Sequence, residues 1–172
     1  MPTTSPDVVT PCLLIVDDEQ AHLKTLERLF TRQNYRVLSA QNGQQALDLL
    51  RKHHVHLLIT DLMMPGQVDG MDLLALCKTL SPDTEVILMT AFGTVERAVQ
   101  GMKEGAYDFI TKPIKRDAIL KSASKALERQ ALIAENKALK ERVKKGDASA
   151  EDEMYEVEEA LDKANAILKK EK

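Results

Sequence analysis

The chain has 172 residues, of which 44% are hydrophobic and 30% charged, and its 27 acidic and 24 basic residues give a net charge of −3. A chain of this length suits one globular domain with an appendage, and its composition excludes a disordered protein. The charge balance excludes a strongly basic surface for nucleic acid, and the longest apolar run, residues 12–16, is far short of the roughly 20 residues that span a membrane.

The first eleven residues, 1–11, contain three prolines and no basic segment. They predict a disordered leader rather than a signal peptide. The two cysteines, Cys12 and Cys77, lie in apolar or helical patterns and are expected to be buried, reduced thiols rather than a disulfide. We therefore expect a cytoplasmic protein with no membrane insertion and no direct nucleic acid binding.

From residue 12 onward, short apolar runs alternate with longer amphipathic segments. Parallel strands need right-handed crossover helices, so this alternation predicts an α/β fold with a doubly wound, five-stranded parallel sheet covered on both faces. The expected strands are 12–16, 36–40, 56–60, 85–89 and 108–110, and the expected helices are 21–33, 44–53, 71–80, 95–103 and one that begins near 115.

Polar residues follow four of the expected strands directly. Asp17 and Asp18 follow the first strand, Asp61 the third, Thr90 the fourth and Lys112 the fifth. In open sheets of this kind, ligands bind outside the carboxyl ends of the strands, where the strand order reverses. We therefore expect these side chains to meet at one edge of the sheet.

Three carboxylates that converge at one point would repel one another unless a cation lay among them. Oxygen ligands without His or Cys at metal-ligand spacing favour Mg²⁺. A carboxylate beside Mg²⁺, a lysine and a hydroxyl has what is needed to capture a phosphoryl group as an acyl phosphate. The alternative for any single residue is a capping role, and Asp69, which precedes Gly70, is expected to be a turn or helix-cap residue.

Four segments give the chain its resemblance to a known family. Over residues 12 to about 127 it resembles the response-regulator receiver domain, which is shared with the chemotaxis response regulator, and it is most similar to the receivers of NtrC-type transcription activators. This resemblance implies a flavodoxin-like fold with strand order 2-1-3-4-5. The segments are Ile15-Val-Asp-Asp-Glu19, Leu58-Ile-Thr-Asp-Leu-Met-Met-Pro-Gly66, Val86-Ile-Leu-Met-Thr-Ala91 and Ala106-Tyr-Asp-Phe-Ile-Thr-Lys-Pro113.

The resemblance also implies a role for each residue at the sheet edge. Asp61 would be the phospho-acceptor, and Lys112 would contact the phosphoryl group. Mg²⁺ would be held by Asp17, Asp18, Asp61 and the backbone carbonyl of Met63. The phosphoryl donor would be a sensor histidine kinase or a phosphotransfer protein.

A switch is implied as well. Thr90 and Phe109 would form the switch pair, which reshapes the face made by the fourth helix, the fifth strand and the fifth helix. The peptide bond between Lys112 and Pro113 is expected to be cis. One departure from the family pattern is an extra residue in the loop 65–70, which leaves the shape of that loop open.

The C-terminal part, residues 128–172, is expected to be a helical, coiled-coil extension of the receiver domain 12–127. Residues 118–145 lack Gly and Pro, which favours one long helix, and Ser149 with Asp152 resembles a capping box for a second helix. Apolar residues repeat at heptad spacing in both segments, with Asn136 at a core-type position. The repeats are Leu132, Asn136, Leu139 and Val143, then Met154, Val157, Leu161, Ala164 and Leu168.

The repeats do not determine how the two helices of the extension are arranged. It could fold back as a hairpin or extend, and it could pack on its own receiver or form a homodimer or bind a partner. From Arg116 to Lys172 there are 13 basic and 13 acidic residues, which does not suit DNA, and no phosphate-binding loop of an ATPase follows the receiver.

The sequence as a whole predicts a response regulator that catalyses its own aspartyl phosphorylation and slow dephosphorylation, and that acts as a switch rather than a metabolic enzyme. Three alternatives stay open. These are a fragment of an NtrC-type activator that lacks its ATPase and DNA-binding domains, a phosphorylation-independent scaffold, and a phosphohydrolase of the haloacid dehalogenase type. The last is disfavoured because Met63 stands where such enzymes carry a second Asp.

Overall fold

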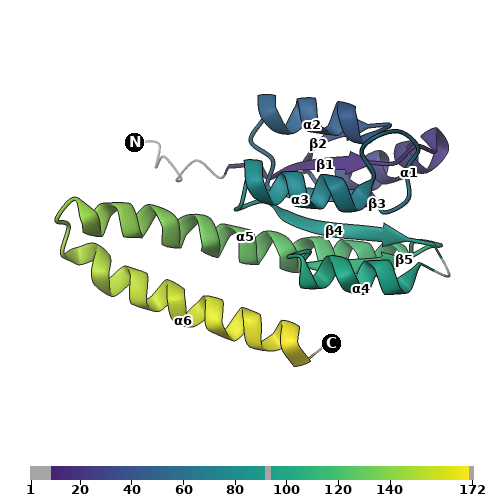
Figure 1. Ribbon diagram of the computed structural model, residues 1–172. Helices are drawn as coiled ribbons and strands as arrows, with labels where there is room; N and C mark the ends of the chain where they lie inside the picture. The colour runs from purple at the N-terminus through teal and green to yellow at the C-terminus, as the bar shows by residue number, and fades with distance from the viewer. Residues whose placement is uncertain (1–8, 92–93, 171–172) are drawn as a thin grey trace.

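The computed structural model describes residues 9–91 and 94–170, so most of the expected leader 1–11 lies outside the described residues. Within them, five parallel strands form one sheet in the order β2-β1-β3-β4-β5, which confirms the predicted fold class and strand order (Figure 1). The strands are β1 (Cys12–Val16), β2 (Arg36–Ala40), β3 (Leu57–Asp61), β4 (Glu85–Thr90) and β5 (Asp108–Thr111).

Six helices are described, and their bounds lie close to those expected from the sequence. Residues 95–103 were predicted without error, whereas the first helix begins and ends one to two residues earlier than predicted. The helices are α1 (Gln20–Thr31), α2 (Gly43–Lys52), α3 (Gly70–Leu80), α4 (Val95–Lys103), α5 (Arg116–Lys144) and α6 (Ser149–Lys170).

The strand sequences are apolar because the sheet is covered on both faces. Every residue of β1, β3 and β4 is buried, whereas the edge strand β2 is partly exposed and correspondingly more polar. Alternate residues of each strand point to opposite faces. Leu58 faces a core with α2, α3 and α4, and Ile59 faces one with α1 and α5.

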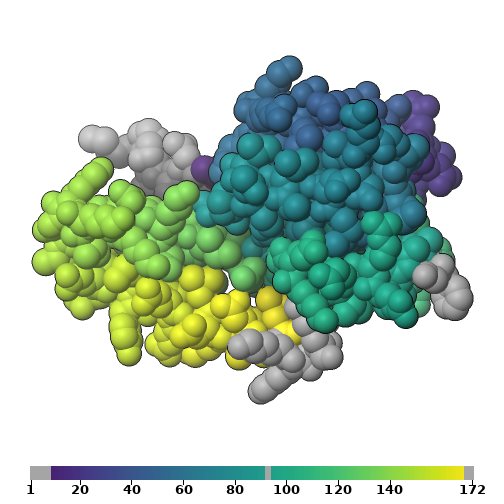
Figure 2. Space-filling model, viewed as in Figure 1, coloured from purple at the N-terminus to yellow at the C-terminus, as the bar shows by residue number. Residues whose placement is uncertain are grey.

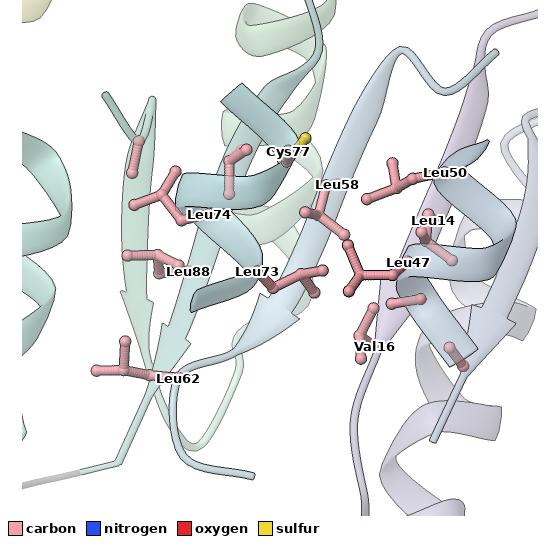
Figure 3. Close-up of a cluster of buried hydrophobic side chains, with 14 of the residues drawn as sticks. Leu14, Val16, Leu47, Leu50, Leu58, Leu62, Leu73, Leu74, Cys77 and Leu88 are labelled. Atoms are coloured by element: carbon pink, nitrogen blue, oxygen red, sulfur yellow. The ribbon is translucent and has the colours of Figure 1, made fainter. Parts of the chain in front are cut away.

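The core under α2 and α3 is shown in Figure 3. Leu47 and Leu50 of α2 meet Leu14 of β1, and Leu73 of α3 lies over Leu58 of β3. Cys77 belongs to this core, and burial raises the pKa of its thiol to about 11. Both cysteines are free and buried, as predicted.

Side chains before two of the helices accept hydrogen bonds from the first helical turn. The Asn42 side chain accepts a hydrogen bond from the backbone N–H of Gln45. Asp69 and Asp72 form a reciprocal capping box at the start of α3. The prediction that Asp69 is a cap residue is confirmed.

The loop with the extra residue is held against α2. A Cβ atom at Gly43 would lie 2.4 Å from the Val68 carbonyl oxygen and 2.6 Å from its Cβ atom, so only glycine allows this approach. The loop between β3 and α3 therefore packs on the start of α2.

The C-terminal extension folds back on itself. Helix α5 runs without a break from the receiver through the predicted boundary at residue 128 and projects beyond the sheet, and α6 returns beside it (Figure 1). The turn contains Gly146 with φ of +89°, which glycine adopts without strain. Of the two arrangements left open by the sequence, the structure has the hairpin.

The predicted capping box at Ser149 is wrong. Ser149 lies inside α6 instead of preceding it, and its N–H and hydroxyl both donate to Asp147 Oδ1, at 3.1 and 2.6 Å. Asp147, two residues before Ser149 in the chain, therefore accepts the hydrogen bonds at the start of α6 in place of the predicted Ser149 cap.

We use the term C-terminal hairpin for residues 128–170, and receiver for residues 12–127. The hairpin is visible as an arm that projects from the receiver in Figure 2. It is anchored by Arg129, whose guanidinium donates to both oxygens of the buried Glu85 at 2.7 and 2.8 Å and to Asn165 at 2.9 Å. Across the described residues, 9–91 and 94–170, no helix combines the length and apolarity needed to cross a bilayer.

Candidate functional site

Three carboxylates converge at the carboxyl ends of β1 and β3. Asp17, Asp18 and Asp61 each offer an oxygen, and these oxygens lie within 4.8 Å of one another. Asp17 and Asp61 are buried and Asp18 is exposed. Parallel pairing of β1 with β3 brings the two strand ends together, since Val16 pairs with Thr60 just before the acidic residues.

Lys112 lies between two of these carboxylates. Its Nζ donates to Asp61 Oδ2 at 2.8 Å and to Asp17 Oδ2 at 3.3 Å. The backbone N–H of Lys112 donates to the Thr90 carbonyl oxygen at 2.7 Å, which ties the end of β5 to the end of β4. The Lys112–Pro113 peptide bond is cis, the geometry that the resemblance implies.

His22 also contacts the cluster, and sequence reasoning missed it. Its Nδ1 contacts Asp17 Oδ2, while Asp17 Oδ1 accepts a hydrogen bond from the Glu19 N–H at 2.9 Å. His22 lies five residues after Asp17, on the first turns of α1. The five-residue spacing from Asp17 was the one sequence signal for this contact. It was not sufficient, because the direction of the imidazole depends on the bend of the chain between β1 and α1.

At both Asp61 and Lys112, burial and the opposite charge nearby shift the pKa in opposite directions. Burial raises the pKa of Asp61, the ammonium group of Lys112 opposes that rise, and Asp17 adds to it. Burial would lower the pKa of Lys112, but Asp61 and Asp17 outweigh it, so that this pKa is raised. A second positive charge among the carboxylates would relieve their mutual repulsion.

Thr90, at the end of β4, is buried, and the contacts of its hydroxyl are with the segment before α4 and not with the carboxylates. Its hydroxyl contacts the Thr94 hydroxyl and lies 3.3 Å from the Ala91 carbonyl oxygen. Phe109, on β5, is half-buried and packs against the core that contains α4. The two residues expected to form a switch pair thus lie on neighbouring strands, with Leu88 of β4 paired to Phe109.

Arg97 of α4 links two residues from the loop that follows Asp61. Its guanidinium donates to Asp69 Oδ2 at 3.1 Å and to Met63 Sδ at 2.7 Å. Burial would raise the pKa of Asp69, but the hydrogen bonds from Asp72 and Arg97 outweigh it and lower that pKa. Asp69 is engaged as a cap and an ion-pair partner, not as a member of the carboxylate cluster.

The donor set suits a hard divalent cation. Carboxylate oxygens from Asp17, Asp18 and Asp61 are the ligands that Mg²⁺ takes in proteins, and no cysteine joins them. Met63 follows Asp61 closely, and its backbone N–H lies 3.4 Å from Asp61 Oδ1, so its backbone borders the cluster. The arrangement combines three carboxylates that could hold a cation with a lysine that contacts two of them, and a threonine hydroxyl lies at the end of the neighbouring strand β4.

Comparison with known proteins gives a consistent result. The profile of the response regulator receiver domain matches residues 13–124. The chain is 38% identical over 119 residues to the transcriptional regulatory protein GlrR of Escherichia coli, and 34% identical over 130 residues to the C4-dicarboxylate transport regulator DctD of Rhizobium meliloti. These alignments cover 69% and 76% of this chain but only 27% and 28% of the relatives, so the chain spans little more than a quarter of their length.

Solved structures of similar proteins also match most of this chain. A receiver domain protein from Clostridium thermocellum is 29% identical with a TM-score of 0.68, covering 72% of this chain and 98% of that one. NtrX from Brucella abortus is 30% identical with a TM-score of 0.70, covering 73% of this chain and 29% of that one.

Proposed function

This chain belongs to the response regulator receiver domain family, similar to the receivers of NtrC-type regulators, and we propose that it accepts a phosphoryl group on Asp61 from a sensor histidine kinase or a phosphotransfer protein. The observation that carries the proposal is the contact of Lys112 Nζ with Asp61 Oδ2 at 2.8 Å, inside the carboxylate cluster. This contact joins the ends of β3 and β5, which are 51 residues apart in the chain.

The proposed step is a transfer between two protein side chains. An oxygen of the Asp61 carboxylate attacks the phosphorus of a phosphohistidine, forming a P–O bond, while the P–N bond breaks and its electron pair stays on the donor imidazole. Lys112 neutralises the transferred oxygens, since its ammonium group already contacts the acceptor oxygen. The receiver thereby catalyses its own phosphorylation, and water later hydrolyses the acyl phosphate slowly, which releases inorganic phosphate and restores the Asp61 carboxylate.

Mg²⁺ would be held by Asp17, Asp18 and Asp61, with the backbone carbonyl of Met63 as a further ligand. When bound, the ion supplies positive charge to the oxygens of the transferred group. His22 and Glu19 restrain the Asp17 carboxylate through its two oxygens. This restraint holds one ligand in place before any cation arrives.

The proposed switch begins at Thr90. Its hydroxyl is occupied by Thr94 and Ala91 in this structure, and a phosphoryl group on Asp61 would offer it a stronger, charged acceptor. Turning the hydroxyl toward Asp61 releases its contact with Thr94 at the start of α4. Phe109 would then move into the space behind it, which changes the face formed by α4, β5 and α5.

The phosphoryl donor could approach the cluster through a groove beside it. It is a cavity of about 700 Å³ between α1 and the start of α5, and Lys112 and His22 are among the residues that line it. Arg28, Arg32 and Arg116 also line it. A basic groove that shares Lys112 with the acceptor site suits a donor that carries negative phosphoryl charge.

We further propose that this module works in the cytoplasm and that the C-terminal helices transmit its state to a partner or a second copy. The relatives are longer than this chain, since the alignment covers only 27% of GlrR. Coupling of the receiver to an output through α5 is consistent with the continuous helix that leaves the sheet.

The test is phosphorylation of the purified chain by acetyl phosphate with Mg²⁺. We expect intact-mass measurement to find one added phosphoryl group, and none in the Asp61→Asn variant or after removal of Mg²⁺ by chelation. Asp48→Asn, which removes an exposed carboxylate on α2, is the matched control and should be labelled normally. Unchanged labelling of Asp61→Asn would contradict the site, and many rounds of phosphate release per molecule would instead support a phosphohydrolase.

A further inference from the structure

The apolar stripe of α5 is already occupied by the same chain. Its residues at heptad spacing pack against the corresponding stripe of α6, so the surface that the sequence marks for a coiled coil is covered within one molecule. The buried members of this seam are Leu139, Ala150 and Val157, and the partly buried ones are Leu132, Val143, Met154 and Leu161.

Asn136 does not fit this closed arrangement. It lies in the same stripe, between Leu132 and Leu139, and its Oδ1 is buried without a hydrogen-bond partner. Within residues 9–91 and 94–170 it is the one buried side-chain oxygen or nitrogen in that position. An unsatisfied buried acceptor costs about 1–3 kcal/mol, so pairing α5 with α6 leaves a defect at the centre of the seam.

The polar contacts between the described parts of α5 and α6 lie mostly at exposed side chains. The hydrogen bond from Arg129 to Asn165 is 2.9 Å, whereas the ion pairs of Lys140 with Glu158, at 3.9 Å, and of Arg142 with Glu153, at 3.4 Å, are exposed. Exposed ion pairs contribute little to stability. At the far end of α6, Leu168 is only partly buried where it packs on the core beneath α5.

We propose that α6 is a displaceable cover of the α5 stripe, and that the α5 helix of a second copy takes its place when α6 lifts. In a parallel pair of α5 helices, Asn136 faces Asn136 of the second copy, so each amide can donate to the oxygen of the other. A single asparagine at such a position specifies a two-stranded, in-register pair in coiled coils. The two-fold arrangement thus satisfies the atom that the hairpin leaves without a partner.

This inference does not rest on phosphorylation of Asp61. The residues that carry it lie in the hairpin, and its test needs neither Mg²⁺ nor a phosphoryl donor. If the labelling experiment failed, the proposal about α5 and α6 would still stand. If the α6 variants behaved otherwise than expected, the proposal that Asp61 is phosphorylated would still stand.

The experiment weakens the α6 side of the seam without changing α5. We expect sedimentation equilibrium to find the unmodified chain monomeric and the Val157→Ser/Leu161→Ser variant dimeric over the same concentrations. The matched control is Tyr155→Ser/Ile167→Ser, which removes two exposed apolar side chains from α6 and should stay monomeric. A swapped pair of hairpins would need the α6 stripe, so a dimer of the weakened variant requires contact between α5 helices.

Two further variants test the α5 contact itself. Adding Leu139→Ser to the weakened variant should restore the monomer, and adding Asn136→Cys should give a disulfide between two copies under mild oxidation. The native thiols, Cys12 and Cys77, are both buried and do not compete for this bond. The proposal is overturned if the weakened variant stays monomeric, with or without loss of its helical circular dichroism signal, or if its dimer forms no disulfide through position 136.

Discussion

The receiver and the C-terminal hairpin differ most in how much apolar surface each buries. Among the described residues, the two receiver cores contain 17 and 14 buried apolar side chains, whereas the hairpin contains 3. Buried apolar area is the main source of folding free energy. The receiver can therefore hold a fixed site at its sheet edge, while the hairpin is the part whose arrangement can change at low cost.

The largest expected effect tests that difference directly. Leu58→Ala removes a fully buried side chain from the centre of the sheet and should lower the free energy of unfolding by about 3–5 kcal/mol. Leu161→Ala, the same change in the partly buried seam, should lower it by about 1 kcal/mol. Urea unfolding followed by circular dichroism measures both, and equal losses would show that the hairpin is as tightly packed as the receiver.

The next effect concerns the link between the two regions. Arg129→Ala leaves the Glu85 carboxylate, 1% exposed, without the Arg129 Nη1 that donates to both of its oxygens, so we expect a loss of about 3 kcal/mol in unfolding free energy. Adding Glu85→Gln should recover part of the loss because it removes the buried charge. Arg142→Ala, which breaks exposed ion pairs in the hairpin, is the control and should change stability little.

A smaller effect of opposite sign is expected at the seam. Asn136→Leu replaces a partly buried side chain, whose Oδ1 is buried without a partner, by an apolar side chain of similar size, which should raise the free energy of unfolding by about 1 kcal/mol. Lys140→Leu adds a leucine at an exposed position of α5 and should give no such gain. Thermal unfolding of the two variants side by side distinguishes the outcomes, and a destabilised Asn136→Leu would mean that the amide is satisfied in solution.

The smallest effect is a pH dependence at the end of the receiver sheet opposite the carboxylate cluster. His56 Nδ1 accepts a hydrogen bond from the Cys12 N–H at 3.0 Å, and burial, with a smaller contribution from His54, lowers the pKa of His56 below its ordinary value of 6.5. The unfolded chain then takes up the proton first as the pH falls, so the receiver should lose stability below pH 6.5 until the lowered pKa is passed. His56→Gln should remove this part of the pH dependence in urea unfolding measured on both sides of 6.5.

Much of the receiver could be predicted from the chain alone, for a physical reason. Strands such as Cys12–Val16 are buried on both faces, so their sequences are continuous apolar runs that stand out from the amphipathic helices. Parallel pairing then brings the ends of these strands together, which predicts that Asp17, Asp61 and Lys112 meet. The contacts of His22 with Asp17 and of Thr94 with Thr90 were not predicted, because they depend on how α1 and α4 turn after their strands.

The alternation of strands and helices, the sheet edge with the carboxylates and the apolar stripes of the last two helices all follow from the order of residues in the chain. What those stripes contact depends instead on how the folded helices pack. A heptad repeat specifies which face of a helix is apolar and not which helix covers it, so the same residues suit a hairpin or a pair of chains. The choice depends on contacts between distant residues, such as Arg129 with Glu85 and with Asn165, that leave no local pattern in the sequence.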